Sequence, residues 1–429
     1  MKSLLRSDNA EVSKFQLQEL HKLLDHVSKH SPFYKRLLSE KSVSSSSIKT
    51  LSDLSKIPFT TKEDIEKQNE DFFCVERKKI LDYVTTSGTL GKPITIALTD
   101  NDLKRLAQNE KTSFEITGGT ENDVYQLMTT IDRRFMAGLA YFLGTRELGA
   151  GIIRVGNGIP ELQWDTINRI KPNAIICVPS FILKLISYAT ENNIDFKRSS
   201  IKKAICIGEP IRNEDFSLNI LGQKIKELWN IELFSTYASS EMGSAFTECE
   251  AGKGGHLQPD LLIAELVDED GNHVKENEQG ELVVTTLGIE GTPLLRFKTG
   301  DICKMHYEKC SCGRTSPRIS PILGRKKQMI KFKGTTLFPN AFFEVLDSVK
   351  EVKNYQIEVF TNEIGTDEIV AKVFCQSPSE KLEKDIKDHF RAKLRVAPAI
   401  IFETGEKLRN EVFPEASRKP IRFVDKRKS

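Results

Sequence analysis

At 429 residues, of which 39% are hydrophobic, the chain is long enough for two domains or for a large composite domain plus a small one. Its 63 lysines and arginines nearly balance 60 aspartates and glutamates, and this interspersed charge of +3 argues against a dedicated nucleic-acid binder. No stretch reaches the roughly 18 apolar residues of a membrane span. Residues 7–9 are polar, where a signal peptide would have an apolar run. We therefore expect no membrane contact, no signal peptide, a cytoplasmic location and mostly reduced cysteines.

The first predicted elements are helices. Leu17, Leu20, Leu24 and Val27 recur at helical spacing with charged residues between them. We expect residues 10–80 to look helical and to pack against the main domain.

A loop rich in glycine and hydroxyl residues follows at residues 84–93. Gly88 and Gly91 allow a tight turn with inward N–H groups, the hydroxyls add donors, and Lys92 adds a positive charge. Apolar residues before it and the run 94–96 after it predict a strand on each side. The glycine spacing differs from that of the P-loop, and the composition fits either a phosphate cradle or a solvated hairpin loop.

Strands and helices then alternate, after a helix expected over residues 104–117. Short apolar runs at 174–178 and 204–207 are each followed by turn residues, and a helix is expected between them over 181–189. This βαβ pattern predicts an α/β fold with a substantial parallel sheet. Ligands of such sheets gather at the carboxyl ends of the strands.

After Gly254 the pattern changes to strands and hairpins. Residues 263–267 and 280–285 are predicted strands, and residues 268–272 between them form a turn. This part is expected to be a small β subdomain.

We place the main domain boundary in the charged stretch 324–328. Residues 1–326 would form the large N-terminal domain, and residues 327–429 a small α+β domain with helices over 341–349 and 381–394.

Several motifs together resemble one enzyme superfamily. Four occur in the order and approximate spacing of the adenylate-forming enzymes: the loop 84–93, Tyr237-Ala238-Ser239-Ser240-Glu241, the segment from Arg296 to Asp301, and Leu323-Gly324-Arg325. Five further segments resemble the phenylacetate-CoA ligase branch in particular: residues 31–34, 57–62, 208–210, 310–314 and 337–339. The resemblance covers nearly the whole chain.

This resemblance implies a large adenylate-forming N-terminal domain and a mobile C-terminal lid. It also implies a reaction in two steps. A carboxylate and MgATP give an acyl-adenylate and pyrophosphate, and the thiol of CoA then displaces AMP.

The implied roles of individual residues agree with this chemistry, because an anion attacking a polyanion needs positive charge and oriented donors. Lys92 would hold the β- and γ-phosphates, Glu241 would bind Mg²⁺, and Asp301 would accept from the ribose hydroxyls. Glu241 could instead be a solvated surface carboxylate, and Asp301 could simply cap a turn. The other nucleotide-binding residues implied by the resemblance form the phosphate loop, the adenine wall and an arginine near the ribose or phosphate: Thr86, Ser87, Gly88, Thr89, Gly91, Gly208, Glu209, Pro210, Tyr237, Ala238, Ser239, Ser240 and Arg325.

The C-terminal tail resembles the closing motif of the superfamily. Counting back from Asp425 places Lys419 on the catalytic lysine of adenylation, with Arg418 where glycine is usual. Lys327 stands where the hinge of the lid lies in the family. A terminal lysine is otherwise an ordinary solvated charge.

The segment 129–136 departs from the branch, which there carries a glycine- and aromatic-rich substrate wall. In this chain the segment instead contains Arg133 and Arg134, shortly before Met136. The arginines are either a surface pair or contacts for a second polar or anionic group of the acid or for an acceptor phosphate. Phenylacetate is therefore not carried over as the substrate.

Cys249, His256, Cys310 and Cys312 would make a Cys₃His set, the right number and type of ligands for a structural Zn²⁺. Cys310 and Cys312 lie in a polar, glycine-containing loop where packing is a poor reason for cysteine. The alternative is three reduced cysteines and a histidine without a metal. Cys303 and His306 are nearby spare candidates.

The sequence thus predicts an ATP-dependent acid-CoA ligase for an aromatic or aryl-alkanoic carboxylic acid, with ATP, Mg²⁺ and CoA, and a structural Zn²⁺. One alternative is an adenylating enzyme that passes the acyl or AMP group to an acceptor other than CoA. Another is a non-catalytic regulatory protein that binds nucleotide. Homodimer formation stays open.

Overall fold

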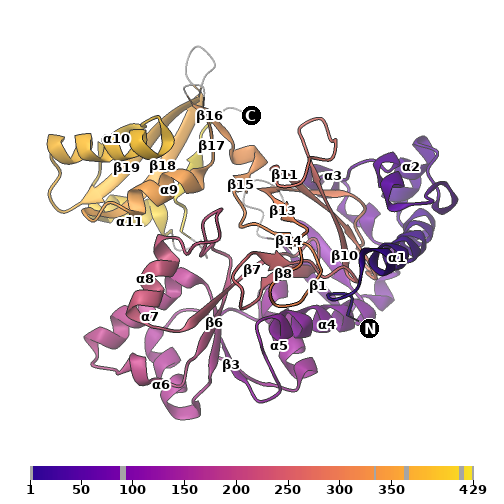
Figure 1. The fold of residues 1–429 in the computed structure, drawn as a ribbon, viewed down its shortest axis with the longest axis horizontal. Helices are drawn as coiled ribbons and strands as arrows, with labels where there is room; N and C mark the ends of the chain where they lie inside the picture. The colour runs from indigo at the N-terminus through magenta and orange to yellow at the C-terminus, as the bar shows by residue number, and fades with distance from the viewer. Residues whose placement is uncertain (1–2, 87–92, 333–334, 362–366, 415–419, 428–429) are drawn as a thin grey trace. The chain divides into compact units, whose positions relative to one another are not determined.

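The computed structural model describes residues 3–86, 93–332, 335–361, 367–414 and 420–427. The chain divides into two units, one made of Met1–Thr299 with Cys303–Pro321 and the other of Gly300–Ile302 with Ile322–Ser429 (Figure 1). The predicted mixed α/β fold with a large unit and a small α+β unit is confirmed. The boundary between residues 326 and 327 stays a prediction.

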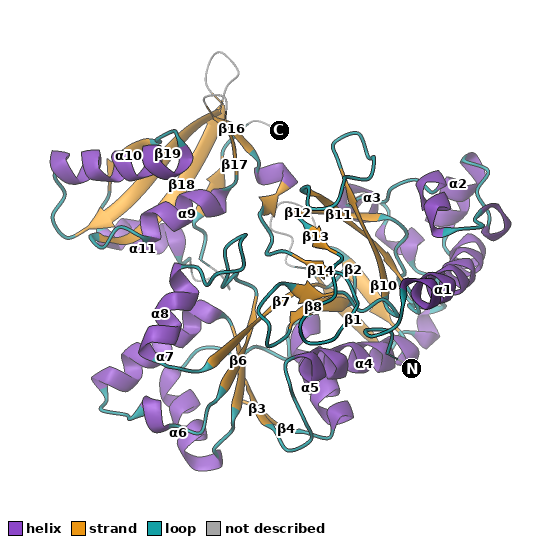
Figure 2. Ribbon diagram, in the orientation of Figure 1, coloured by secondary structure: helices purple, strands orange, loops and turns teal. Residues whose placement is uncertain are grey.

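A nine-stranded sheet organises the large unit (Figure 2). Five neighbouring strands are parallel, in the order β4 (Gly151–Arg154), β3 (Val124–Leu127), β5 (Ala174–Cys177), β6 (Lys203–Ile207) and β7 (Glu232–Ser239). The sheet continues with antiparallel strands β8 (Ser244–Glu248), β9 (Gly255–His256), β14 (Arg318–Ile319) and β13 (Met305–His306). The apolar runs that predicted a parallel sheet are therefore its central strands, β5 and β6, which are buried throughout.

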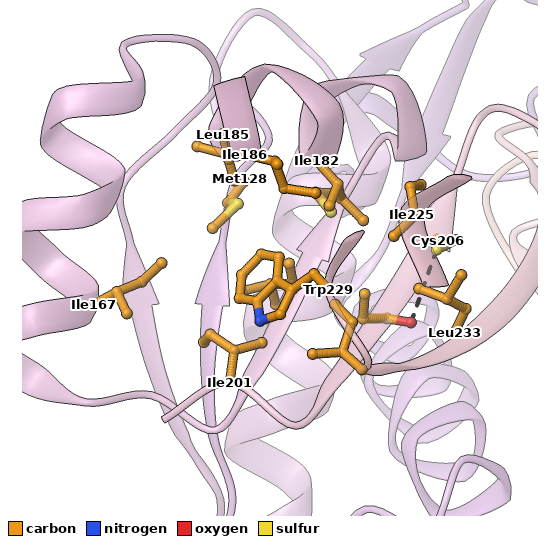
Figure 3. Packing of buried hydrophobic residues seen from close by; sticks show 14 of the residues in the cluster. Met128, Ile167, Ile182, Leu185, Ile186, Ile201, Cys206, Ile225, Trp229 and Leu233 are labelled. Carbon is orange, nitrogen blue, oxygen red and sulfur yellow. Dashed lines mark hydrogen bonds between the residues drawn. The ribbon is translucent and has the colours of Figure 1, made fainter. Parts of the chain in front are cut away.

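Helices cover both faces of the parallel strands, which explains why those strands are apolar on both sides. One face is covered by α6 (Pro160–Ile170), α7 (Pro179–Glu191) and α8 (Ile220–Leu228), the other by α4 (Asp100–Ile116) and α5 (Met136–Leu148) (Figure 1). Figure 3 shows the first of these cores, in which Trp229 lies among aliphatic side chains of the sheet and the helices. Its ring centroid lies 5.5 Å from that of the fully buried Trp164.

The N-terminal part of the large unit is helical, as predicted, but the helix is interrupted. Its helices are α1 (Asn9–His30), α2 (Pro32–Glu40) and α3 (Lys62–Lys67). Ser31 alone separates α1 from α2, and 3₁₀ turns at Ser45–Ser47 and Leu51–Lys56 lie between α2 and α3. Asp8 caps α1 by accepting from the backbone N–H of Glu11, and Leu20, Leu24 and Val27 on its apolar face are buried. Among the described residues no helix combines the length and hydropathy needed to cross a membrane.

Two smaller β structures complete the large unit. The hairpin β1 (Asp82–Thr85) and β2 (Thr95–Leu98) flanks the glycine-rich loop. The predicted strands of the β subdomain are β10 (Leu262–Val267) and β11 (Gly280–Thr286), which pair antiparallel. Strands β12 (Phe297–Cys303) and β15 (Gly324–Arg325) pair antiparallel through Asp301–Ile302 and Gly324–Arg325, which belong to the small unit.

The small unit has a four-stranded sheet in the order β20 (Ala399–Phe402), β19 (Asp367–Cys375), β18 (Val352–Thr361) and β21 (Phe423–Asp425). Its helices are α9 (Pro339–Asp347), α10 (Glu380–Leu394) and α11 (Gly405–Val412), and a short hairpin of β16 (Ile330–Phe332) and β17 (Thr335–Leu337) precedes them. Phe342 of α9 and Phe390 of α10 are fully buried against the sheet. Helices α9 and α10 correspond to the two helices predicted over residues 341–349 and 381–394.

Candidate functional site

Three predicted site segments follow parallel strands of the nine-stranded sheet at its carboxyl edge. Residues 128–135 follow β3, Gly208 follows β6, and Glu241 lies in the turn after β7. Strands β6 and β7 are neighbours, and β5 alone separates β6 from β3. The fold therefore brings together segments that are more than 100 residues apart in the sequence, at the edge where ligands of parallel sheets bind.

The hairpin β1–β2 is attached to the same edge. The N–H of Thr85 donates to the carbonyl oxygen of Arg134 (3.0 Å), and Thr86 closes the hairpin by bonding twice to Ile94. Five of the predicted loop residues lie outside the described residues, together with Leu90: Ser87, Gly88, Thr89, Gly91 and Lys92. The ends of the hairpin nevertheless bring the start and the end of this loop to the segment that follows β3.

The loop after β6 is held by a carboxylate. Gly208 has φ 75°, a conformation that glycine adopts without strain. Both oxygens of Glu209 accept hydrogen bonds from Ser180, one from its backbone N–H (2.9 Å) and one from its hydroxyl (3.0 Å). Because Ser180 is in the first turn of α7, Glu209 ties this loop to the start of that helix.

Glu241 is partly buried in a four-residue turn between β7 and β8, which are in register from Thr236 with Thr247 to Ser239 with Ser244. Tyr237, Ala238 and Ser239 form the end of β7, and Ser240 begins the turn. The hydroxyl of Ser239 accepts from the N–H of Met242 (3.3 Å), which helps to fix the turn.

Sequence reasoning missed Arg105, a buried arginine of α4 that holds this turn. Its guanidinium donates to four oxygens: the carbonyls of Gly243 (2.8 Å), Leu261 (2.7 Å) and Leu287 (2.6 Å) and the hydroxyl of Ser244 (3.1 Å). Burial lowers the pKa of Arg105 to about 10, so the side chain is still charged at neutral pH. Arg105 thereby fixes the base of the turn that carries Glu241.

Arg133 and Arg134 are exposed and have an unusual backbone conformation. Their φ angles are 58° and 57°, in the left-handed region that residues with a side chain adopt at a cost of about 1–3 kcal/mol each. Met136, by contrast, is buried at the start of α5. Gly138 allows α5 to approach this segment, because a Cβ there would lie 1.9 Å from the carbonyl oxygen of Thr130.

The segment from Arg296 to Asp301 begins at a buried ion pair. Arg296 donates from Nε and Nη2 to the two carboxylate oxygens of Glu265 (3.1 and 3.0 Å) and from Nη1 to the carbonyl oxygen of Ile57 (2.7 Å). Its guanidinium also lies 4.0 Å from the ring centroid of Phe59. The 57–62 motif therefore supports the start of β12.

In the small unit, Asp301 of β12 is paired in register with Arg325 of β15. The Nε of Arg325 lies 3.3 Å from Oδ1 of Asp301, and the carboxylate is largely buried whereas the arginine is half exposed. Asp301, predicted to contact the ribose, and Arg325, predicted to contact the ribose or a phosphate, are thus neighbours. Lys327 lies two residues further on, in the 3₁₀ turn Lys326–Gln328, and Lys419 lies outside the described residues.

The predicted metal ligands lie together in the antiparallel part of the large unit. One ligand atom from each of Cys249, His256, Cys310 and Cys312 lies within 4.8 Å of the others. Sγ of Cys249 is 3.7 Å from Sγ of Cys310, and Sγ of Cys312 is 3.5 Å from Nε2 of His256. Cys303 and His306 are not part of this group.

The histidine of this cluster is oriented for binding. Its Nδ1 lies 3.0 Å from the hydroxyl of Ser316, which leaves Nε2 toward the sulfurs. Burial, together with the positive charges of Arg314 and Arg318, lowers the pKa of His256 to about 3. The imidazole is therefore neutral and has a lone pair available.

The comparison with known families agrees with this geometry. The family described as "AMP-binding enzyme" matches residues 14–290, which include the hairpin and all three segments at the carboxyl edge. The chain belongs to the AMP-binding enzyme family. This confirms the resemblance to the adenylate-forming enzymes.

Among curated proteins, the chain is 31% identical to a phenylacetate-coenzyme A ligase of Thermus thermophilus over 410 residues, 89% of this chain and 91% of that protein. It is 29% identical to the phenylacetate-coenzyme A ligase of Escherichia coli over 81% of this chain and 79% of that protein. The fold matches a solved 2-hydroxyisobutyryl-CoA ligase in its postadenylation state, with a TM-score of 0.83 at 21% identity over 98% of this chain and 90% of that one. These matches support the phenylacetate-CoA ligase-like branch.

Proposed function

We infer that this protein is an ATP-dependent, AMP-forming acid-CoA ligase that works through an acyl-adenylate. The observation that carries this conclusion is the convergence of the hairpin β1–β2, the segment after β3, the loop after β6 and the Glu241 turn at one edge of one sheet. Curated relatives that match over about four fifths or more of their length are phenylacetate-coenzyme A ligases. ATP and CoA are the expected co-substrates.

We propose the following roles in adenylation. Lys92 and the donors of its loop hold the β- and γ-phosphates, and the loop after β6 forms the adenine wall together with Tyr237. The carboxylate of Glu209 is bonded to Ser180 at the start of α7, and we assign the contact with the nucleotide to the backbone around Gly208. Asp301 accepts from the ribose hydroxyls and Arg325 lies beside it.

Glu241 is the residue we assign to Mg²⁺. A single carboxylate fits a cation that keeps most of its coordination for phosphate oxygens and water, and the hydrogen bonds of Arg105 hold the neighbouring backbone in place. When bound, the cation neutralises charge on the phosphates. The chain's own contribution is to fix Glu241 at the carboxyl edge.

A panel experiment tests this function. Pyrophosphate release would be followed with MgATP and a series of aromatic, aryl-alkanoic and aliphatic acids, each with and without CoA. An acid-CoA ligase should release pyrophosphate with its acid and yield a thioester only when CoA is present. Pyrophosphate release without thioester, with an amine or another acceptor consuming the adenylate, would favour the alternative function.

One relative supports the alternative function, in which the acyl or AMP group passes to an acceptor other than CoA. The indoleacetate–lysine synthetase of Pseudomonas savastanoi is 28% identical over 157 residues, 36% of this chain and 35% of that protein. The match is short, so the CoA ligase stays the main proposal. A non-catalytic nucleotide-binding protein would release no pyrophosphate with any acid.

We propose an aromatic or aryl-alkanoic acid as the substrate, with Arg133, Arg134 and Met136 near its distal end. The two strained arginine conformations support a functional segment, because such strain clusters at active sites. Their exposure equally fits a surface pair.

Changing Arg133 to glycine and Arg134 to phenylalanine should shift preference toward plain arylacetates by roughly tenfold or more in relative kcat/KM, if the arginines contact the acid. Glycine tolerates the φ of 58° at position 133, so the variant should fold. The matched control changes the exposed Arg169 to glycine and Arg198 to phenylalanine. An acid profile that is unchanged relative to this control would assign the pair to the surface.

We further propose that the Cys₃His cluster holds a structural Zn²⁺. Zn–S and Zn–N bonds of about 2.3 and 2.05 Å at tetrahedral angles place two thiolates about 3.8 Å apart, and a thiolate and an imidazole nitrogen about 3.6 Å apart. Sγ of Cys249 and Sγ of Cys310 are 3.7 Å apart, Sγ of Cys312 and Nε2 of His256 are 3.5 Å apart, and all four ligand atoms lie within 4.8 Å of one another. The donor set and its spacing therefore fit this ion.

Purified protein should carry about one equivalent of zinc, and Cys312→Ser should lower both metal content and the melting temperature, because structural metal binding is coupled to folding. Metal content would be measured by mass spectrometry and stability by thermal denaturation. The control, Cys375→Ser in the small unit, should keep the metal. If protein that has never been exposed to a chelator contains no zinc, the proposed site is refuted.

The two-step reaction also implies a moving lid. We propose residues 327–429 as the lid and Lys327 as its pivot. Solved structures of 2-hydroxyisobutyryl-CoA ligase include one in the thioesterification state, which this fold matches with a TM-score of 0.70 at 22% identity over 99% of this chain and 91% of that one. A cytoplasmic location and the absence of nucleic-acid or membrane partners stay predictions.

A further inference from the structure

Residues 4–7, which precede α1, are bonded to the loop that carries two of the proposed metal ligands. The carbonyl oxygen of Leu5 accepts from the backbone N–H groups of Thr315 (2.9 Å) and Ser316 (3.2 Å). The hydroxyl of Thr315 donates to the carbonyl oxygen of Ser7 (2.6 Å). Leu5 and Thr315 are 310 residues apart in the sequence, so the fold brings the first turn of the chain to this loop.

The side chain of Leu5 packs against two of the proposed thiolate ligands. Leu5 is 7% exposed and lies in one buried cluster with Cys249 and Cys310. Ile116, at the end of α4, belongs to the same cluster. An apolar shell around a metal site controls the access of solvent to the ion. The side chain of Leu5 is therefore part of the wall of the site.

The other two proposed ligands are also linked to this segment. Nη2 of Arg6 donates to the carbonyl oxygen of Cys312 (3.3 Å). Ser316, whose N–H is bonded to Leu5, has its hydroxyl 3.0 Å from Nδ1 of His256. The segment thus touches three of the ligand residues directly and reaches the histidine through the residue that orients it.

We propose that residues 4–7 form a strap that covers the metal site and sets the rate at which its zinc exchanges with solution. The proposal rests on the proposed Cys₃His zinc site and not on the ligase reaction. Zinc leaves only after water or a chelator has replaced every ligand, and Leu5 packs against two of the thiolates. Lifting the strap breaks the hydrogen bonds of Leu5 to Thr315 and Ser316, so these bonds oppose release.

A role in packing alone predicts a different result. Leu20 of α1 is fully buried in the same unit but is not a member of the cluster that contains Leu5 and the cysteines. Replacing either leucine by alanine removes the same atoms from the core and leaves a cavity. If Leu5 contributed only to packing, both substitutions would affect zinc release through global stability. The strap predicts faster release from the Leu5 variant alone.

The test measures zinc release from the full-length protein, after its zinc content has been determined by mass spectrometry. An excess of a chelating dye starts the release and reports it by absorbance. Leu5→Ala shortens the side chain that packs against the thiolates, and Thr315→Val removes the hydroxyl that bonds to Ser7. The matched controls are Leu20→Ala and Thr190→Val, which removes a hydroxyl bond within α7. Each variant is also loaded with Co²⁺, whose absorption spectrum reports its thiolate ligands.

We expect Leu5→Ala to release zinc at least about fivefold faster than the wild-type protein, because contacts outside the ligands change metal affinity by about 10–100-fold. Thr315→Val should also release zinc faster, and it decides the proposal if Leu5→Ala does not fold. The Co²⁺ spectrum of both variants should keep its wild-type form, since no ligand has been changed. Both controls should release zinc at the wild-type rate.

Wild-type release rates in both strap variants, or equally fast release from the controls, would overturn the strap. A Co²⁺ spectrum that differs from that of the wild-type protein would assign the faster release to altered ligands and would also overturn it. If the wild-type protein contains no zinc, the metal site is refuted and the strap with it. The ligase function is decided separately, by pyrophosphate release.

Discussion

Replacing Lys419 by alanine is expected to slow adenylation on the order of 10² or more. In the proposed reaction this lysine bridges the attacking carboxylate and the α-phosphate, where a compact positive charge stabilises the negative charge that develops. The lid then takes the lysine away before CoA attacks. Thioester formation from presynthesised acyl-adenylate and CoA should therefore proceed near the wild-type rate.

Both half-reactions would be measured on the same preparations, with pyrophosphate release for the first and thioester appearance for the second. Lys426→Ala is the matched control, since Lys426 lies seven residues away and pairs with Glu358 (2.8 Å) on the sheet of the small unit. It should leave adenylation within a few fold. Parallel losses in both half-reactions, or no loss in either, would show that Lys419 is misassigned or that the lid does not alternate.

Changing Glu241 to glutamine should abolish pyrophosphate release that depends on MgATP, while the protein keeps its fold. The amide removes the negative charge that a hard cation prefers but keeps the size of the side chain. Since Arg105 fixes the base of the turn through the carbonyl of Gly243, the substitution should not disturb the neighbouring backbone.

This result would be checked by titrating Mg²⁺ at fixed ATP and by comparing melting temperatures. Glu232→Gln is a suitable control, because Glu232 is exposed at the opposite end of the same strand, β7. Near-normal turnover of the Glu241 variant would contradict the assignment of Glu241 to Mg²⁺ and of this edge of the sheet to ATP binding. A large drop in its melting temperature would instead assign Glu241 to the stability of the turn.

The sequence was sufficient to predict the central strands and the helices around them. Residues 174–177 and 204–207 are apolar on both faces, and a parallel sheet covered by helices on both sides buries such strands. Residues 10–80 were predicted as helical without their interruptions. Ser44 with Ser47 and Thr50 with Asp53 form capping boxes that start short 3₁₀ turns, and these local hydrogen bonds compete with a longer helix.

The contacts that hold the site were less accessible to sequence reasoning. Arg105 and Gly243 are 138 residues apart in the sequence, and Glu209 and Ser180 are 29 residues apart. Contacts at such separations leave no periodic pattern in the sequence from which they could be predicted. The one available sign was the spacing of Asp102, Arg105 and Asn109, which places three polar residues on the same buried face of α4. The gathering of Cys249, His256, Cys310 and Cys312 was predictable because cysteine and histidine are the residue types that structural zinc sites use.

The turn that carries Glu241 has a consequence for how the protein can change over evolution. It joins two antiparallel strands through only four residues, and a single insertion would shift the register and turn alternate side chains to the opposite face. The eight residues between β3 and α5 have no such constraint, because they connect a strand to a helix. Insertions and deletions should therefore accumulate after β3, in the segment proposed to contact the acid, while the length of the turn that carries the proposed Mg²⁺ ligand Glu241 should stay constant.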